Sequence, residues 1–144
     1  RNNGGGLVDA GVDIARLFLR EGEVMRQQFR EEDVEIFEVK ASGPFLEMPL
    51  VVMINGNTAS AAEIIAGALA VHQRAAIIGV PSYGKDTVQY IFDLQDGSSL
   101  HVTSGRWWIP GIDFPLQPDY PLAQDAAEPE YLQKAIMELG NNLP

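Results

Sequence analysis

The sequence lacks cysteine and holds only two histidines, which excludes several classes of functional site. Without cysteine the chain forms no disulfide, no thiolate nucleophile and no cysteine-based zinc site. Two histidines are too few for a His-rich metal centre. Basic residues are also scarce, since 10 of them stand against 20 acidic residues and give a formal net charge of −10. This charge disfavours nucleic acid and anionic lipid as partners.

Long hydrophobic runs are missing as well. No apolar run approaches the ~18 residues of a spanning helix, so we expect no membrane span in this chain. What is present is a chain of 144 residues that is 46% apolar, which is enough for one domain with a sizeable core. A peptide or a small molecule is the partner class that this composition favours.

Helix and strand patterns alternate along the chain and predict an α/β fold. Apolar residues at helical spacing predict helices at about residues 7–18, 60–72 and 129–139. Short apolar or alternating runs predict strands at residues 23–29, 34–40, 49–55 and 75–80, and a hairpin over 88–108 around an Asp-Gly turn. Proline and glycine dominate residues 110–121, which indicates a loop.

The periodicity also predicts which faces of two helices are buried. In the middle helix the buried stripe is Ala61, Ile64, Ile65, Ala68, Leu69 and His72. In the last helix the shared face is Tyr131, Leu132, Ala135, Ile136 and Leu139.

Residues 79–86 almost match a phosphate-binding loop, G-x-x-x-x-G-K-[ST], because they end in Gly84, Lys85 and then Asp86. A phosphate loop must open a helix and needs a hydroxyl for magnesium after the lysine. Here a carboxylate follows the lysine and a strand pattern follows the carboxylate. We therefore reject the nucleotide reading and consider Lys85 as a general base.

A base needs a nucleophile, and Ser60 is the candidate. It follows the apolar strand at 49–55 and opens a helix, which is where sites gather in open α/β folds. There the N–H of Ala61 can stabilise an oxyanion, and the glycines of residues 3–6 permit close approach of a second donor. The alternative stays open, because Ser60 and Glu63 also form the S-x-x-E pattern of a capping box.

Lys85 likewise has a structural alternative as a loop cation that pairs with Asp86 or is solvated. A lysine that serves as a base near neutral pH must lose its charge there, although an ordinary lysine titrates near pH ~10.4. Burial favours the neutral form. We expect Val80, Tyr83 and the neighbouring apolar strands to exclude water from Lys85.

Several separate motifs resemble the catalytic domain of the C-terminal processing peptidases, also called tail-specific proteases. These are RNNGGGLVDAGVDIARLFL, then PLVVMINGNTASAAEIIAGALAVHQRAAIIGVPSYGKDTVQ, and the late QPDYPL with the final helix. The resemblance spans nearly the whole chain, with the motifs in the family order. It implies a crotonase-like, Clp-type β/α core in which a mixed sheet is flanked by helices, with a C-terminal hairpin and helix.

The family motifs imply a role for individual residues. TASAAE places the nucleophile at Ser60, and YGKDTVQ places the lysine base at Lys85 and its orienting partner at Gln89. The R-x-N-x-G-G segment places an oxyanion hole at Gly5 and Gly6 with the Ala61 N–H. Glu63 and Ser82 fall on polar motif positions and are expected to have supporting roles. No metal or cofactor is implied.

The sequence also departs from the family pattern. The residue after the lysine is usually glycine, and Asp86 adds a carboxylate that favours the charged lysine. Full-length members carry a strand before the R-x-N motif and a PDZ domain upstream. We therefore expect residues 1–144 to be a single catalytic domain that is incomplete at its N-terminus and lacks the PDZ domain. An open sheet edge would favour a homo-oligomer.

Two functions remain consistent with these residues. The first is a serine endopeptidase that cleaves unstructured C-terminal tails, in an exported compartment such as the periplasm or cell envelope, as the family implies. The second is an inactive peptide- or ligand-binding domain of the same fold, in which Ser60 only caps a helix. His101 on a strand and the adjacent Trp107 and Trp108 are weaker candidates, since strand aromatics are usually split between core and surface.

Overall fold

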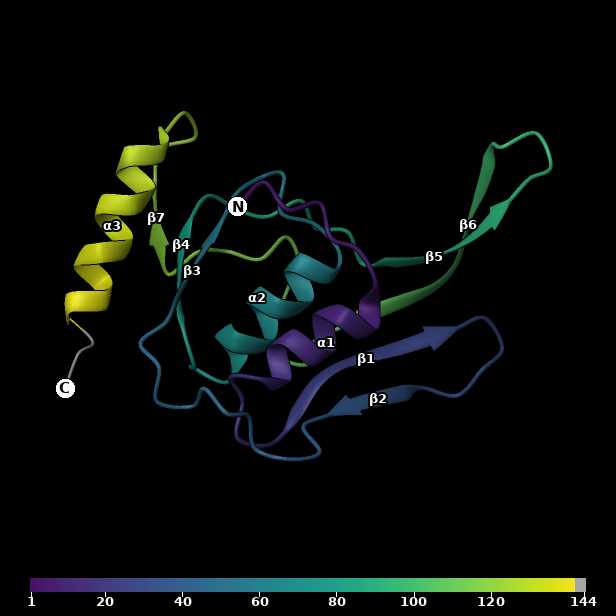
Figure 1. The fold of residues 1–144 in the computed structure, drawn as a ribbon, viewed down its shortest axis with the longest axis horizontal. Coiled ribbons are helices and arrows are strands. Elements are labelled where there is room, and N and C mark those ends of the chain that lie inside the picture. The colour runs from purple at the N-terminus through teal and green to yellow at the C-terminus, as the bar shows by residue number, and fades with distance from the viewer. Residues whose placement is uncertain (142–144) are drawn as a thin grey trace.

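The computed structural model describes residues 1–141, which form two sheets and three helices (Figure 1). The helices are α1 (Val8–Arg16), α2 (Ala61–Val71) and α3 (Glu128–Asn141). The strands are β1 (Glu23–Phe29), β2 (Glu35–Glu38), β3 (Val51–Ile54), β4 (Ala76–Gly79), β5 (Thr87–Asp93), β6 (Ser99–Trp108) and β7 (Tyr120–Pro121). The predicted α/β class, the three helices and the hairpin are confirmed.

The strands divide between two sheets. A parallel sheet has the order β3-β4-β7, with Ile54 beside Gly79 at the end of the first pair. An antiparallel sheet has the order β2-β1-β6-β5. In the parallel sheet β4 is the central strand and is mostly buried, as its apolar run predicts, and α3 packs against β3 and β4.

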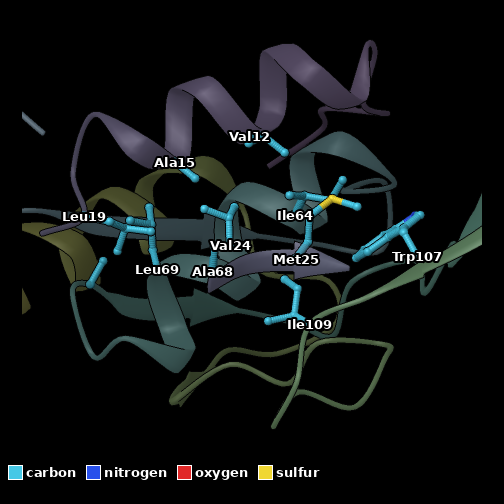
Figure 2. Packing of buried hydrophobic residues seen from close by; sticks show 11 residues of the cluster. Val12, Ala15, Leu19, Val24, Met25, Ile64, Ala68, Leu69, Trp107 and Ile109 are labelled. Atoms are coloured by element: carbon cyan, nitrogen blue, oxygen red, sulfur yellow. The ribbon is translucent and has the colours of Figure 1, made fainter. Parts of the chain in front are cut away.

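The main core lies where α1 and α2 meet β1 and the end of β6. Figure 2 shows side chains from all four elements converging there, with Val12, Met25, Ile64 and Trp107 among them. Gly11 lets the two helices approach closely, since a Cβ at this position would lie 3.0 Å from the Ala61 carbonyl oxygen. This packing holds α2, and with it the serine turn, against the rest of the domain.

The β5–β6 hairpin extends away from this core as a ribbon (Figure 1). Its residues 89–103 are all exposed, including large apolar side chains such as Ile91, Phe92 and Leu100. The end of the hairpin at Trp107 is therefore buried in the core. Its far end is stabilised mainly by the hydrogen bonds between β5 and β6.

Three local predictions were wrong. His72 ends α2 as an exposed residue whose Nε2 contacts the Glu23 carbonyl oxygen at 2.8 Å. The buried face of α3 is formed by Tyr131, Ala135 and Glu138, whereas Leu132 is 47% and Ile136 is 70% exposed. Finally, the loop predicted for residues 110–121 ends in β7, which pairs with Ile78 and Gly79 of β4.

Candidate active site

Ser60 lies where the turn after β3 becomes α2, and its backbone is strained. Its φ of 55° and ψ of −124° are unusual for a residue other than glycine, at a cost on the order of 1–3 kcal/mol. Neighbouring groups hold this conformation. The Ala59 N–H donates to the Asn3 carbonyl at 3.0 Å, and the Ser60 N–H donates to the Glu63 carboxylate at 2.8 Å. Ser60 is half-buried between the buried Ala59 and Ala61.

The predicted capping box is present, with the Ser60 side chain at the Glu63 N–H and the Glu63 carboxylate at the Ser60 N–H. The bond with normal geometry is the one from the Ser60 N–H to Glu63. The Glu63 N–H donates to the Ser60 carbonyl oxygen at 2.7 Å. The Glu63 N–H therefore has its main hydrogen bond with the Ser60 carbonyl oxygen, and its contact with the Ser60 side chain is secondary. The structural alternative, a capping box, is therefore formed by both residues of the pair.

Glu63 is fully buried, and its carboxylate accepts four hydrogen bonds. One oxygen, Oε2, accepts from the Ser60 N–H at 2.8 Å and from the Lys85 N–H at 3.0 Å. The other, Oε1, accepts from the Gly84 N–H at 2.7 Å and from the Ser82 hydroxyl at 2.5 Å. Since Ser60 and Lys85 donate to the same oxygen atom, Glu63 holds the backbones of the serine turn and the lysine loop beside each other.

Ser82 is also buried and links this cluster to the late loop. Its hydroxyl oxygen accepts the Leu116 N–H at 2.8 Å while its proton goes to Glu63. The Tyr83 N–H donates to the Thr58 carbonyl at 2.9 Å, which adds a second connection between the lysine loop and the serine turn. The expected supporting positions Glu63 and Ser82 are thus in direct contact with each other.

The Lys85 side chain is half-buried, and its Nζ donates to Gln89 Oε1 at 3.2 Å. The amide of Gln89 lies 3.4 Å from Thr103 Oγ1 on the neighbouring strand, a long contact. Val80 and Tyr83 were both expected to shield Lys85 from water. Val80 is buried, but Tyr83 is 68% exposed, so the prediction for Tyr83 was wrong. β5 begins two residues after Lys85, which agrees with the rejection of a phosphate loop.

The glycine segment of residues 4–6 runs beside the serine turn. Gly5 has a φ of 97°, and a Cβ there would lie 2.7 Å from the Ala59 carbonyl oxygen, 2.8 Å from Ser60 Cβ and 3.0 Å from the Ala61 nitrogen. Gly5 must therefore be glycine for the segment to lie this close. A Cβ on Gly6 would meet nothing within 4 Å. Of the two predicted glycines, Gly5 is thus the one in contact with Ser60.

Asp86 turns its carboxylate to Arg106 of β6. Its Oδ2 accepts from Arg106 Nη2 at 2.6 Å and from Nε at 3.2 Å, and the Asp86 carbonyl accepts the Trp107 N–H at 2.9 Å. Sequence reasoning did not identify Arg106. The feature of the sequence that could have indicated Arg106 is the charge of Asp86, because a carboxylate at this position is stabilised by a nearby cation.

A cleft of about 510 Å³ lies beside Asp86 and Arg106. Its walls come from β1, the lysine loop, the end of β6 and the loop that follows: Gln28, Gly84, Asp86, Arg106, Trp107, Trp108, Ile112, Asp113 and Phe114. Trp107 is buried and Trp108 is half-buried, so the two tryptophans are divided as adjacent strand residues usually are. Both nevertheless border the cleft.

The remaining candidate position, His101, lies apart from this cluster. His101 is exposed on β6, where its Nε2 lies 3.1 Å from the Ser99 hydroxyl. Among the described residues no group of three or more His, Cys, Asp or Glu side chains could hold a metal ion. Over the same range, no helix combines the length and the apolar character needed to cross a bilayer.

Comparison with known proteins identifies what this arrangement is similar to. The model of the family described as peptidase family S41 matches residues 1–122. A carboxyl-terminal-processing protease of Synechocystis is 43% identical over 110 residues, and carboxyl-terminal-processing peptidase 1 of Arabidopsis thaliana, named as chloroplastic, is 41% identical over 111. Both alignments cover 76% of this chain but only 26% and 23% of those proteins, so this chain spans about a quarter of these relatives.

Solved structures have the same fold. The photosystem II D1 C-terminal processing protease superposes with a TM-score of 0.71 at 36% identity, over 91% of this chain and 35% of that one. A lipoprotein from Streptococcus agalactiae also reaches 0.71, at 19% identity, over 99% of this chain and 53% of that one. The second match extends the likeness of fold alone, since its identity is low.

Proposed function

This chain belongs to peptidase family S41, and from that premise we propose that it carries a serine peptidase site that cleaves unstructured protein tails, with Ser60 as nucleophile and Lys85 as base. The observation that carries the proposal is the Glu63 carboxylate, whose Oε2 binds the backbone N–H groups of both residues. A buried carboxylate with four donors is a rigid link, because loss of any bond would leave a polar group unpaired.

In the proposed first step Lys85 Nζ accepts the proton of the Ser60 hydroxyl as Ser60 Oγ attacks the carbonyl carbon of the substrate. The carbonyl oxygen becomes an oxyanion, for which the Ala61 N–H at the start of α2 and the backbone near Gly5 are the proposed donors. The protonated Lys85 then gives its proton to the leaving amine as the C–N bond breaks. An acyl ester on Ser60 remains.

In the second half Lys85 activates a water that attacks the ester, and the proton returns to Ser60 Oγ as the acyl group leaves. Gln89 accepts a hydrogen bond from Lys85 Nζ, which supports its proposed role in orienting the amine. Every step uses groups of this chain, the substrate and water, so the proposed reaction needs no metal or cofactor.

The names of the relatives support unstructured tails as the substrate class. The relatives are named as carboxyl-terminal-processing proteases. An exported location for this chain is proposed from the resemblance, and the chloroplastic names belong to the relatives that carry them.

Hydrolysis of an unfolded peptide with a nonpolar C-terminus tests this function. We expect turnover by the parent chain and at least about 10⁴-fold less in Ser60→Ala and in Lys85→Ala, as for other residues that act as one unit. Ser99→Ala and Lys40→Ala are the matched controls, and circular dichroism checks that all variants fold. A base should also give a rate that rises with pH. No turnover at any pH would favour the inactive binding domain.

A further inference from the structure

The cleft beside Asp86 and Arg106 has no role in the proposed reaction. Its volume of about 510 Å³ is within the range of roughly 300–1,000 Å³ that is usual for ligand pockets. The apolar part of its lining is formed by Trp107, Trp108, Ile112 and Phe114. Ligand pockets usually combine such an apolar, aromatic wall with a few charged or polar groups. The charged groups therefore decide which ligand fits this cleft.

Three charged side chains line the cleft, and one of them is left without a partner. Asp86 accepts two hydrogen bonds from Arg106, so these two charges offset each other. The third, Asp113, is exposed, and within residues 1–141 its carboxylate forms neither an ion pair nor a hydrogen bond. An anionic ligand would be repelled by this carboxylate, and an apolar ligand would cover it without a partner, which is unfavourable. A cation is the ligand that complements the cleft.

The loop that carries Asp113 is fixed at both ends. Ile109 is 2% exposed and Leu116 is 4% exposed, so each end is anchored by a buried side chain. The Leu116 N–H also donates to the hydroxyl of Ser82, which lies in the segment that leads to the lysine loop. Because the loop is held in this way, little ordering is required when a ligand binds, and this lowers the cost of binding.

The register of the hairpin places the cleft on the same face of the sheet as Gln89, which binds the Lys85 amine. Side chains two residues apart on a strand share a face, so Thr87 lies on the face of Gln89. The extra residue of the register shift, Ser104, is on β6 and leaves this alternation intact. Thr87 is directly opposite Arg106, which borders the cleft. Since two residues of strand span about 7 Å, an extended peptide that passes Gln89 can reach the cleft with a side chain.

We propose that this cleft is a subsite for a lysine or arginine side chain of the peptide substrate, with Asp113 as the partner of the cation and Trp108 as the surface on which the side chain lies. An aromatic ring attracts a cation and also packs against the methylene groups of these side chains. The net charge of −10 favours the approach of cationic peptides as well. The assignment to a substrate rests on the proposed function, whereas binding of the cation can be measured without turnover.

Tryptophan fluorescence measures binding at this place, because both tryptophans of the sequence line the cleft. Ser60→Ala is titrated with a short peptide of alanine and serine that has a single lysine. Matched peptides have norleucine or glutamate in place of the lysine. We expect the lysine peptide to bind about 5-fold more tightly than either of them. This preference should shrink as salt is added.

Variants made in the Ser60→Ala background test the two proposed groups separately. Asp113→Asn should remove the preference for lysine over norleucine, and Asp113→Lys should reverse it in favour of glutamate. Trp108→Ala should weaken binding of the lysine peptide by about 10-fold, with Trp107 left as the reporter. Asp125→Asn is the matched control and should keep the preference, since Asp125 is an exposed aspartate that does not line the cleft. Circular dichroism checks that each variant folds.

Hydrolysis by the parent chain tests whether the subsite belongs to the substrate. In peptides that differ only in the position of the lysine, the cleaved bond should move with the lysine and stay about two or three residues from it. Mass spectrometry of the products identifies this bond. Cleavage that ignores the lysine would overturn the inference and leave the proposed function standing.

The binding data can overturn the inference independently. Equal affinity for the lysine, norleucine and glutamate peptides would do so, as would a preference for lysine that survives in Asp113→Asn. A preference that depends on Asp113, but without turnover by the parent chain, would support the cleft as a cation site and count against the proposed function instead.

Discussion

The serine turn, residues 55–63, and the lysine segment, residues 84–106, supply the two halves of the proposed dyad and are built differently. In the turn, Thr58, Ala59 and Glu63 are buried, and α2 is packed on both α1 and β1. In the lysine segment residues 84–88, 104 and 105 are half-buried, while residues 89–103, which form the extended ribbon in Figure 1, and Arg106 are exposed. The proposed nucleophile is thus held by a packed core, and the proposed base is held by a few hydrogen bonds.

This difference teaches where the site depends on single contacts. Ser60 keeps its strained backbone because packed residues on both sides hold it. Lys85 has a main-chain bond to Glu63 and a side-chain bond to Gln89, and it adjoins an ion pair that is partly exposed. Changes in the turn should therefore affect both stability and activity. Changes to the groups that contact the Lys85 side chain should affect activity with little loss of stability.

The largest effect is expected at Glu63, where the two regions meet. Glu63→Ala removes the acceptor of four donors, and leaving these buried groups unpaired should lower the free energy of unfolding by about 3 kcal/mol or more. Glu63→Gln should lose less, because the amide oxygen still accepts from two donors. Urea unfolding followed by circular dichroism measures both.

The control for Glu63 is Glu47→Ala, which removes a carboxylate that is 90% exposed. It should change stability by less than about 0.5 kcal/mol. If Glu63→Ala behaved like this control, the link between the serine turn and the lysine loop would be much weaker than its hydrogen bonds suggest.

Gly5, which contacts the serine turn, should show the next largest effect. Gly5→Ala introduces a Cβ that would lie 2.7 Å from the Ala59 carbonyl oxygen, at a φ of 97° that side chains rarely adopt. Displacement of the proposed oxyanion donors should lower kcat by about 10²-fold. Gly6→Ala is the matched control, because its Cβ would meet nothing within 4 Å. Equal rates for the two alanine variants would contradict the proposed oxyanion site.

Gln89→Ala tests the lysine side alone. Loss of the bond from Lys85 Nζ should lower the rate of hydrolysis by about 10-fold, while stability should stay near that of the parent because Gln89 is exposed. Steady-state kinetics and urea unfolding are compared with those of Gln95→Ala, at the exposed hairpin turn. A large fall in stability without a change in rate would reverse the contrast drawn between the two regions.

The smallest effect on the site is expected at the ribbon tip. Ile91 is 61% exposed on the edge strand β5, so Ile91→Ser should change stability by no more than about 0.5 kcal/mol and leave the rate unchanged. The same change should reduce self-association if exposed apolar residues and open strand edges cause it. Light scattering at high concentration checks this, and a monodisperse parent monomer would count against the predicted homo-oligomer.

The sequence was most informative where a residue type is tied to a motif or to a periodic run. The strands at 23–29 and 75–80, the helix after Ser60 and the hairpin all follow from local pattern, and the resemblance to the family motifs pointed to Ser60, Lys85 and Gln89. The contact between Glu63 and the Lys85 N–H could not be read in this way, because it joins residues 22 positions apart through a buried carboxylate.

Sequence reasoning failed where partners distant along the chain decide. Glu138 is 4% exposed on α3 because Lys134 pairs with it at 2.6 Å, and its hydrogen bond to Tyr120 raises the pKa of that phenol. Helical periodicity ranks apolar residues and cannot reveal such a partner, so the predicted face was misplaced. β7 has two residues, one of them proline, which is too short for a strand pattern. The position of Arg106 on β6 relative to Asp86 depends on the register of the β5–β6 hairpin, and this register shifts between Val88 and Gln89.

The central claim is that Ser60 becomes acylated with the help of Lys85, and trapping the acyl-enzyme tests it most directly. The chain is mixed with an unfolded peptide, quenched in acid within the first turnover, digested and analysed by mass spectrometry. The account predicts an ester on the fragment that contains Ser60 in the parent chain, and none in Ser60→Ala or Lys85→Ala. Continued cleavage by Ser60→Ala, or an adduct on another residue, would contradict it.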